Sequence, residues 1–353
     1  MSRVKPVVAV TGLEGRDNPY PGVAFASALR AARGDAIVLV GLAYEPTLTG
    51  CFRGDLFDRV YLTPLPGGPS ATLLRRLREI HEEMPIDVLV PALDSELAVF
   101  AAHREELAGW GIRMTIPSAE SVRVRYKQRL ARWAGRNGIF TPKTEVITDP
   151  ERFFRREEWR FPCFLKGPLA DAVGVECVEE AIAACGRLAS RWGFPVLAQE
   201  ALLGEEYDVC SVAMPSGAEA ATIAIKKTIQ NSAGKAIGAE VVDDPDVLAA
   251  GRIVLEALAW EGPCEIEFLR EFSSKRLFLL EVNARFPAWI GVAPAVGVNL
   301  PDLNLRIALQ EPLPQAVRPR VGCRFLRSSR TSLSRAEDLG DLLSLGRLTH
   351  EKD

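Results

Sequence analysis

Acidic and amide side chains recur at alternate positions in two short segments late in the chain. Alternate side chains of a β-strand share a face. The spacing therefore predicts that Glu265 and Glu267 share a face of one strand, and that the next strand presents four side chains on one face: Leu279, Glu281, Asn283 and Arg285. A polar turn at 270–276 separates the two segments, so we expect them to pair as a hairpin.

Such a hairpin brings two or three carboxylates and an amide onto one surface, where like charges repel unless a cation compensates them. Mg²⁺ binds oxygen ligands of this kind and keeps positions for phosphate. The pattern therefore predicts a magnesium site on this surface. A solvated hydrophilic sheet face is the alternative, but exposed strands rarely present two acids, an amide and an arginine in register.

Several lysines are candidates for binding phosphate as point charges. Lys166 ends the apolar segment 161–166, and Lys127 lies among arginines in one long predicted helix over 118–137. Lys226 and Lys227 are adjacent on a predicted strand, so only one of them can face a site. Taken alone, Lys166 and the pair Lys226 and Lys227 are equally well explained as an ordinary strand-end lysine and a solvated edge, and Lys127 is better explained as part of a solvated helix face.

A linker at 199–207 follows a further predicted strand. Its backbone and apolar side chains can hold a purine, and Glu206 can accept hydrogen bonds from ribose hydroxyls. An amphipathic linker without a ligand is the alternative. The residues that would line the pocket are Gln199, Glu200, Ala201 and Leu202.

The elements that position these residues follow two patterns. Over 1–117, apolar runs alternate with amphipathic helical patterns, which predicts a parallel α/β sheet with strands at 7–10, 37–40, 87–93 and 112–116. From Phe161 onward, consecutive strands predict an α+β region with antiparallel pairs. We expect a short strand at 322–326 and a loose tail after it.

Bulk composition excludes several classes of protein. The net charge of -3 does not favour binding to nucleic acid or to an anionic membrane surface. The seven cysteines occur singly and only three histidines are present, which argues against disulfides, a zinc site or a histidine-based nucleophile. No signal peptide or membrane-spanning run is evident, so we expect a cytoplasmic protein with no membrane or nucleic-acid partner.

The order of these parts resembles the ATP-grasp superfamily, with the carbamoyl-phosphate-synthase-like, carboxylate–amine ligase group closest. The parts are a helix lysine, a strand-end lysine, a Gln-Glu linker, a strand glutamate and Glu281-Val-Asn283-Ala-Arg285, the most specific of them. The resemblance implies an α/β, Rossmann-like preATP-grasp domain followed by an α+β ATP-grasp fold with ATP between two lobes. We expect the domain at 1–117, a small lobe with its linking helix at 118–200, a large lobe with the metal site at 201–326, and a C-terminal tail at 327–353.

The resemblance also implies roles for single residues. Lys127 would contact the α-phosphate or the adenine side, Lys166 the α- and β-phosphates, and Arg285 the γ-phosphate or an acyl phosphate. Gln199 to Leu202 would line the adenine pocket and Glu206 would bind ribose. The ligands of Mg²⁺, or of Mn²⁺ in its place, would be Glu267, Glu281 and Asn283.

Family enzymes activate a small carboxylate as an acyl phosphate, which an amine or another nucleophile then attacks, and a homodimer is compatible with the resemblance. The loop 167–175 departs from the family pattern because it has only two glycines, and Asp171 would oppose phosphate. An ATP-binding protein with little or no turnover is therefore the alternative function.

Two features of the first domain leave further alternatives. The turn 11–15 superficially resembles a dinucleotide loop but lacks GxGxxG, so an oxidoreductase is a remote alternative and a structural turn is favoured. Asp94 follows a predicted strand at the edge where open α/β sheets bind ligands. It caps the next helix by default, or else meets the amino substrate.

Overall fold

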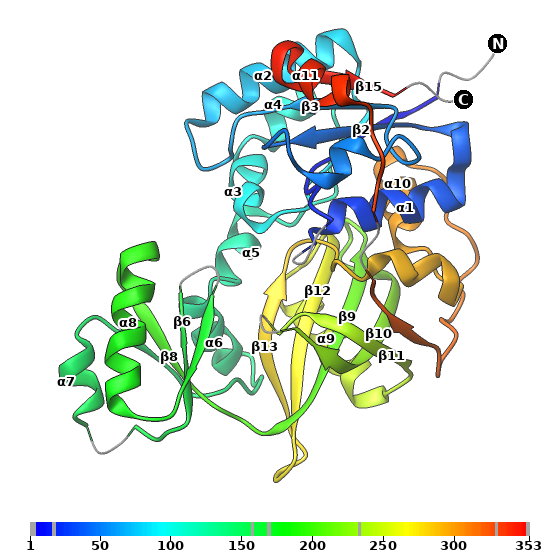
Figure 1. The fold of residues 1–353 in the computed structure, drawn as a ribbon. Helices are drawn as coiled ribbons and strands as arrows, with labels where there is room; N and C mark the ends of the chain where they lie inside the picture. Colours follow the sequence, from blue (N-terminus) through cyan, green and yellow to red (C-terminus); the bar gives the residue numbers. More distant parts are fainter. Residues whose placement is uncertain are drawn as a thin grey trace.

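The computed structural model describes residues 5–15, 19–156, 159–167, 171–231, 234–328 and 331–350. Figure 1 shows three sheets: the first near the top, a small sheet to one side, and a long antiparallel sheet below the first. In the described part of the chain, none of the helices combines the length and apolar character needed to cross a bilayer.

The first sheet is parallel over four strands, as the alternating pattern predicted. The strand order is β3-β2-β1-β4, with β1 (Val7–Val10), β2 (Val38–Ala43), β3 (Arg59–Leu62) and β4 (Val88–Val90). All four residues of β1 are buried, which is the pattern of a parallel strand covered on both faces. The helices of this region are α1 (Pro21–Arg33), α2 (Ser70–Glu83), α3 (Asp94–Ala102) and α4 (Arg104–Gly109).

The small sheet is antiparallel, in the order β5-β8-β6-β7. Its strands are β5 (Thr144–Ile147), β6 (Cys163–Lys166), β7 (Ala172–Val175) and β8 (Val196–Glu200). Two helices, α7 (Pro150–Phe154) and α8 (Val178–Trp192), close a hydrophobic core over it that is separate from the rest of the molecule. This part of the chain therefore forms a lobe of its own.

The long sheet is antiparallel, in the order β13-β12-β9-β10-β11-β14. Its strands are β9 (Gly204–Ala213), β10 (Glu219–Gln230), β11 (Ala236–Val242), β12 (Gly262–Glu271), β13 (Leu277–Asn283) and β14 (Arg324–Leu326). Helix α9 (Pro245–Ala257), helix α10 (Leu300–Leu309) and the 3-10 turn η3 (Ile290–Val296) accompany it. Its hydrophobic cores continue into those of the first sheet, so these two sheets form one body.

The prediction of one long helix over 118–137 is wrong, because this segment forms two helices, α5 (Ala119–Val124) and α6 (Lys127–Arg136). Tyr126 has the extended backbone of a helix N-cap, with φ -59° and ψ 127°. The Arg125 side chain turns away to bind Asp94. Lys127 therefore stands in the first turn of α6, not in the middle of a helix.

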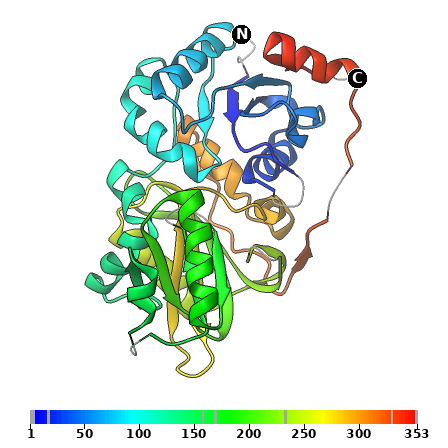
Figure 2. The same cartoon turned by 60° about the vertical axis from the view of Figure 1, so that its left-hand side comes forward.

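Three further expectations need correction. The segment 112–116 forms only a single bridge, from Arg113 to Val88, and not a strand. Strands β3, β7 and β11 were not predicted. The tail is not loose either: α11 (Ala336–Leu345) and β15 (Arg347–Thr349) return to the first sheet, where β15 pairs antiparallel with β3. Figure 2 shows α11 in red beside the N-terminal strands.

Candidate active site

The predicted hairpin forms, and its acidic residues pair across it. In the β12–β13 register, Glu267 lies opposite Glu281 and Glu265 lies opposite Asn283. A bulge at Leu280 breaks the simple alternation, because Phe268 already pairs with Leu279. Leu279 therefore points into the hydrophobic core and not, as the spacing predicted, to the face of Glu281. The polar face of the hairpin therefore consists of Glu265, Glu267, Glu281 and Asn283.

Asn283 connects the carboxylates of this face. Its Nδ2 donates to Glu265 Oε2 and to Glu267 Oε1, at 3.2 Å each. A third acid, Asp208, lies directly opposite Glu267 on the neighbouring strand β9. Carboxylate oxygens of Asp208, Glu265 and Glu267 lie within 4.8 Å of one another. Asp208 was not predicted as a site residue, although it alternates with Glu206 along β9 in the same way as the acids of β12.

Burial and the neighbouring positive charges shift the pKa values of these acids in opposite directions. Burial raises the pKa of Asp208 well above its usual value, although Lys227 opposes the shift. Burial also raises the pKa of Glu265 in spite of Arg285. For Glu267, burial is outweighed by Lys227, so its pKa is lowered. The cluster therefore keeps Glu267 ionised and available as an anionic oxygen ligand.

Lys227, and not Lys226, faces this cluster. Lys227 Nζ donates to Glu267 Oε2 at 2.8 Å, and it lies 3.0 Å from Asp208 Oδ1 and 3.3 Å from Glu206 Oε2. Its side chain is only 2% exposed. Burial alone would lower the pKa of this ammonium, but Glu267 and Asp208 raise it well above its usual value. Lys226 instead pairs with Glu205 at 2.6 Å on a more exposed part of the sheet.

The lysines predicted to bind phosphate approach the same face from the side of the small lobe. Lys127 Nζ lies 3.4 Å from Glu281 Oε1. Burial lowers the pKa of Lys166, and the positive charge of Lys127 adds to the effect, while Glu281 and Glu267 oppose it. The structure thus brings both lysines and both predicted acidic ligands into one polar region, between the small sheet and the long sheet.

Arg285 lies at the end of this region, held between two carboxylates. Its Nε donates to Asp94 Oδ2 at 2.9 Å, and its Nη1 donates to Glu265 Oε2 at 2.7 Å. Arg125 Nη1 donates to Asp94 Oδ1 at 2.8 Å from the other side. Burial would raise the pKa of Asp94, but Arg285 and Arg125 hold it below its usual range. Asp94 is therefore an ionised partner of two arginines.

The predicted adenine segment ends β8 and connects the small sheet to the long sheet. Gln199 Nε2 donates to Thr144 Oγ1 at 3.0 Å, and Glu200 Oε1 accepts a hydrogen bond from the Lys143 backbone at 2.6 Å. Ala201 and Leu202 follow as the chain crosses to β9. Beyond them, the Glu206 carboxylate reaches Lys227. The segment therefore adjoins the polar region at the junction of the two lobes.

Asp171 does not face this region. Its Oδ2 accepts a hydrogen bond from Trp192 Nε1 at 2.8 Å and lies 3.0 Å from Arg191 Nη1. Both partners belong to the end of α8. The loop expected to cover the phosphates lies in part outside the described residues, at 168–170. Residues 172–175 of that loop form β7, which pairs with β6 as a hairpin.

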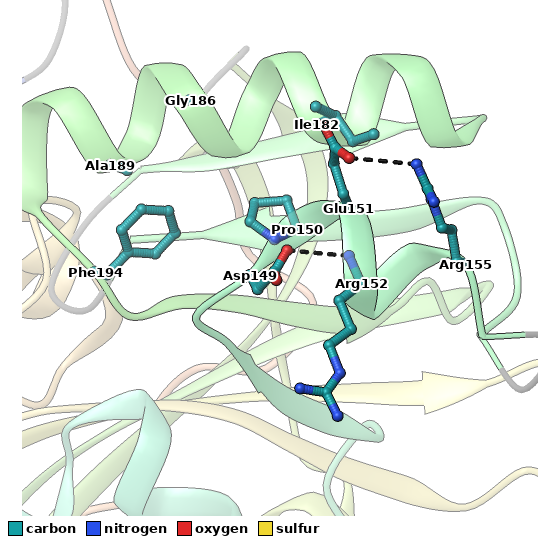
Figure 3. Close-up of a pocket in the computed structure, with 9 residues that line it drawn as sticks. All are labelled: Asp149, Pro150, Glu151, Arg152, Arg155, Ile182, Gly186, Ala189 and Phe194. Atoms are coloured by element: carbon teal, nitrogen blue, oxygen red, sulfur yellow. Dashed lines mark hydrogen bonds and ion pairs between the residues drawn. The ribbon is translucent and has the colours of Figure 1, made fainter.

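A separate pocket on the small lobe contains none of the predicted site residues. Figure 3 shows it between α7 and α8, with Glu151 and Arg155 paired at one side and Phe194 at the other. Two of its acids have local partners: Glu151 pairs with Arg155, and Asp149 accepts a hydrogen bond from the Arg152 amide at 3.0 Å. The candidate active site is therefore the polar region between the lobes.

Comparisons with known proteins identify the fold. A family model described as "ATP-grasp in the biosynthetic pathway with Ter operon" matches residues 193–330. The L-amino acid ligase from Bacillus licheniformis has a similar structure, with a TM-score of 0.66, 17% identity, and coverage of 88% of this chain and 75% of that chain. A comparison with curated protein sequences found no match.

Two other solved structures are similar over the same extent. The biotin carboxylase from Campylobacter jejuni, in a β-γ-ATP complex, gives a TM-score of 0.69 at 15% identity, covering 90% of this chain and 74% of that chain. The N5-carboxyaminoimidazole ribonucleotide synthetase from Thermus thermophilus gives 0.65 at 18% identity, covering 89% and 81%. The predicted fold class is therefore confirmed: the chain has the ATP-grasp fold, with an α/β domain before it.

Proposed function

We propose that this ATP-grasp protein is an ATP- and Mg²⁺-dependent ligase that activates a carboxylate as an acyl phosphate for attack by an amine or another nucleophile. The observation that carries the proposal is the convergence of acids, lysines and Arg285 in one region between the lobes. In particular, Lys127 approaches Glu281, and Glu281 pairs across the hairpin with Glu267. These are the charges that binding and transfer of a phosphoryl group require.

The donor set fits a hard divalent cation. Glu267, Glu281 and Asn283 offer carboxylate and amide oxygens on adjacent strands, which is the ligand chemistry of Mg²⁺ and also suits Mn²⁺. The bound ion would neutralise charge on the phosphates. Asp208 and Glu265 lie beside these residues, and their contacts with Lys227 and Arg285 hold the acidic face in place. We therefore assign the metal ligands to Glu267, Glu281 and Asn283.

The nucleotide would lie against the residues that bridge the lobes. We propose that the segment from Gln199 to Leu202 lines the adenine pocket and that Glu206 binds ribose. Lys127 and Lys166 would then bind the phosphates as point charges. Burial and the positive charge of Lys127 lower the pKa of Lys166, and a bound polyphosphate would offset both effects.

The proposed reaction has two steps. A carboxylate oxygen of the substrate attacks the γ-phosphorus of ATP and the bond to the β-phosphate oxygen breaks, giving an acyl phosphate and ADP. The nucleophile then attacks the acyl carbon and expels inorganic phosphate. Arg285 would offset charge on the transferring group because its guanidinium is held in a fixed orientation by Asp94 and Glu265.

The solved neighbours support this reaction class. One is named an L-amino acid ligase and another is a biotin carboxylase in a β-γ-ATP complex. The alternative is an ATP-binding protein without turnover, which the glycine-poor loop suggested. Asp171 is engaged by Trp192 and Arg191, so the charge that would have opposed phosphate is directed toward α8.

The test measures ADP release across a panel of carboxylic acids and amines, with ATP and Mg²⁺. The informative variant is Glu281→Gln. Its matched control is Glu271→Gln on the same hairpin, because Glu271 lies at the turn, where its carboxylate accepts a hydrogen bond from Ser274. We expect a loss of at least roughly a hundredfold in Glu281→Gln, because a metal ligand is removed, and no change in Glu271→Gln. ATP binding without ADP release on any pair would favour the non-turnover alternative. Equal rates in both variants would refute the assigned site.

A further inference from the structure

Two basic residues of the long sheet, Lys235 and Arg327, have no role in the proposed chemistry. Lys235 lies in the turn between β10 and β11, where its backbone amide donates to Asn231 Oδ1 at 3.0 Å. Arg327 follows β14, and its backbone amide donates to Ile237 O at 2.8 Å. Both side chains are half-buried. They come from neighbouring segments at the edge of the long sheet.

Ring contacts place β14 beside the segment that follows Arg285. Phe325, in the middle of β14, stacks on Trp289 with ring centroids 6.2 Å apart. Trp289 is only four residues after Arg285, and Phe325 is two residues before Arg327. The segment after β13, which we expected to line the acceptor side of the site, is therefore in contact with the strand that carries Arg327.

The strand register places Arg327 on the face of the long sheet that carries Lys227, because Ala239 pairs with both Lys227 and Phe325, and Phe325 and Arg327 are alternate residues. The charges of this region act on one another. Burial lowers the pKa of Lys235, and the positive charges of Arg285 and Arg327 act in the same direction. Glu265 and Asp94 oppose them. Burial likewise lowers the pKa of Arg327, with Glu265 as the opposing charge. Lys235 and Arg327 thus belong to the same polar region as Arg285.

These cations are not balanced. Asp94 pairs with Arg125 and Arg285, and Glu265 also pairs with Arg285. Within the described ranges, the side chains of Lys235 and Arg327 form no ion pair or hydrogen bond with the protein. Half-buried cations are costly without a partner, since they lose hydration. The two carboxylates of Asp94 and Glu265 are therefore outnumbered by the cations around them: Arg125, Arg285, Lys235 and Arg327.

We propose that Lys235 and Arg327 bind a second anionic group of the substrate, so that the acid activated beside Arg285 is a dianion, either a dicarboxylate or a phosphorylated carboxylate. This inference rests on the proposed function, because it takes Arg285 as the place where the carboxylate is activated. The acidic half of the site then serves the metal and ATP, and the basic half selects the acid. An arginine is suited to bidentate binding of a carboxylate or phosphate, and a lysine adds a point charge.

The test compares dianions with monoanions of similar size, glutarate with valerate and phosphoglycolate with glycolate. Binding to the full chain is measured by calorimetry with Mg²⁺ and a non-hydrolysable ATP analogue, so turnover is not needed. We expect at least one dianion to bind roughly tenfold or more tightly than its monoanion, and the ratio to fall to about one in Lys235→Met/Arg327→Met. Arg324→Met is the matched control, because Arg324 is an exposed residue of the same strand.

Two results would overturn the inference: no dianion preference in the wild-type chain, or a preference that survives in the double variant. Affinity for the ATP analogue, measured in the same samples, reports on the proposed function independently. If the wild-type chain binds the ATP analogue but shows no preference for dianions, the substrate inference is refuted and the proposed function is not. If the wild-type chain does not bind the ATP analogue, the proposed function is refuted. Unchanged ATP affinity in the double variant shows that the variant is folded.

Discussion

The carboxylate of Asp94 lies 2.9 Å from Nε of Arg285, although 191 positions separate the two residues in the chain. Asp94 is the first residue of α3, just past the end of β4 in the first sheet, and Arg285 follows β13 in the long sheet. Arg125, just before α6, holds the other oxygen of the same carboxylate. The first domain therefore orients the arginine of the proposed active site.

Replacing Asp94 by asparagine is predicted to impair catalysis without weakening ATP binding. The amide keeps the size of the side chain but removes the charge that holds Arg285, which then keeps only its bonds to Glu265 and to the Phe286 carbonyl. We expect kcat/KM for the acid to fall roughly ten- to hundredfold, because a small displacement of an oriented group has this effect. KM for ATP should stay unchanged. Steady-state ADP release measures both.

The control for this variant is Asp341→Asn, which changes an exposed aspartate of α11. Partial recovery in Asp94→Glu would support a positioning role, since the charge is restored at a slightly different place. If Asp94→Asn has wild-type kinetics, the first domain does not orient Arg285 in the way that we infer.

The parts of the site that depend on local spacing were predictable. The hairpin of β12 and β13, and the pairing of Glu267 with Glu281, follow from period-two alternation on both sides of a polar turn. The start of α5 also has a local signal, because the Ser118 side chain accepts a hydrogen bond from the Ser121 amide three residues later. In each case the signal and the contact lie within one short stretch of chain.

Contacts between distant segments were not predictable in this way. The interaction of Asp94 with Arg285 has no local signal, and neither has the position of Asp208 opposite Glu267. The bulge at Leu280 reversed the face of Leu279, because one extra residue shifts the alternation. The break between α5 and α6 lies at Tyr126, and the neighbouring Arg125 binds Asp94, a tertiary contact that the helical pattern of the sequence does not contain.

Lys227→Met is predicted to destabilise the protein strongly. The ammonium lies within 3.3 Å of carboxylates of Glu206, Asp208 and Glu267 and is almost fully buried. Removing it leaves buried carboxylates without a counter-charge, which costs roughly 3–5 kcal/mol in comparable sites. Chemical denaturation should show this loss in the free energy of unfolding. Lys226→Met is the matched control and should change it by less than about 0.5 kcal/mol, because Lys226 forms a more exposed pair.

The pH dependence of this loss follows from the pKa of Lys227. Its pKa is raised above the usual value of 10.5 in the folded state, so its contribution is fully present below 10.5 and is lost only as the pH rises through the higher folded value. Titration of Lys227 itself therefore adds no pH dependence between pH 6 and 9. Because the variant lacks the charge that lowers the pKa of Asp208, any relief by protonation of that carboxyl should make the destabilisation smaller at the acidic end of this window. The double variant Lys227→Met/Asp208→Asn should recover part of it. A stable Lys227→Met single variant would show that water or a cation replaces the ammonium.

Glu96 is predicted to make the stability of the protein depend on pH. Burial raises the pKa of this carboxyl to about 7, although the hydroxyls of Thr11 and Tyr44 donate hydrogen bonds to it. The backbone amides of Ala92 and Leu93 also donate, at 2.7 and 2.9 Å. A raised carboxyl pKa means that the folded protein binds the proton more tightly than the unfolded chain. Stability is therefore greatest below the usual pKa of 4.5 and falls as the pH rises toward 7.

At about 1.4 kcal/mol per pKa unit, this contribution is on the order of 3 kcal/mol across that window. Glu96→Gln removes the titrating group while keeping the shape and the acceptor oxygen for the Thr11 hydroxyl and the two amides; its NH2 group replaces the oxygen that accepts from Tyr44. We expect the Tm of the variant, relative to wild type, to rise steadily from pH 4.5 to 7 and to level off above it. Thermal unfolding of both proteins at intervals of half a pH unit measures this difference. A difference in Tm that is flat across the window would show that Glu96 does not titrate there, and that the four donors keep it ionised in the folded protein.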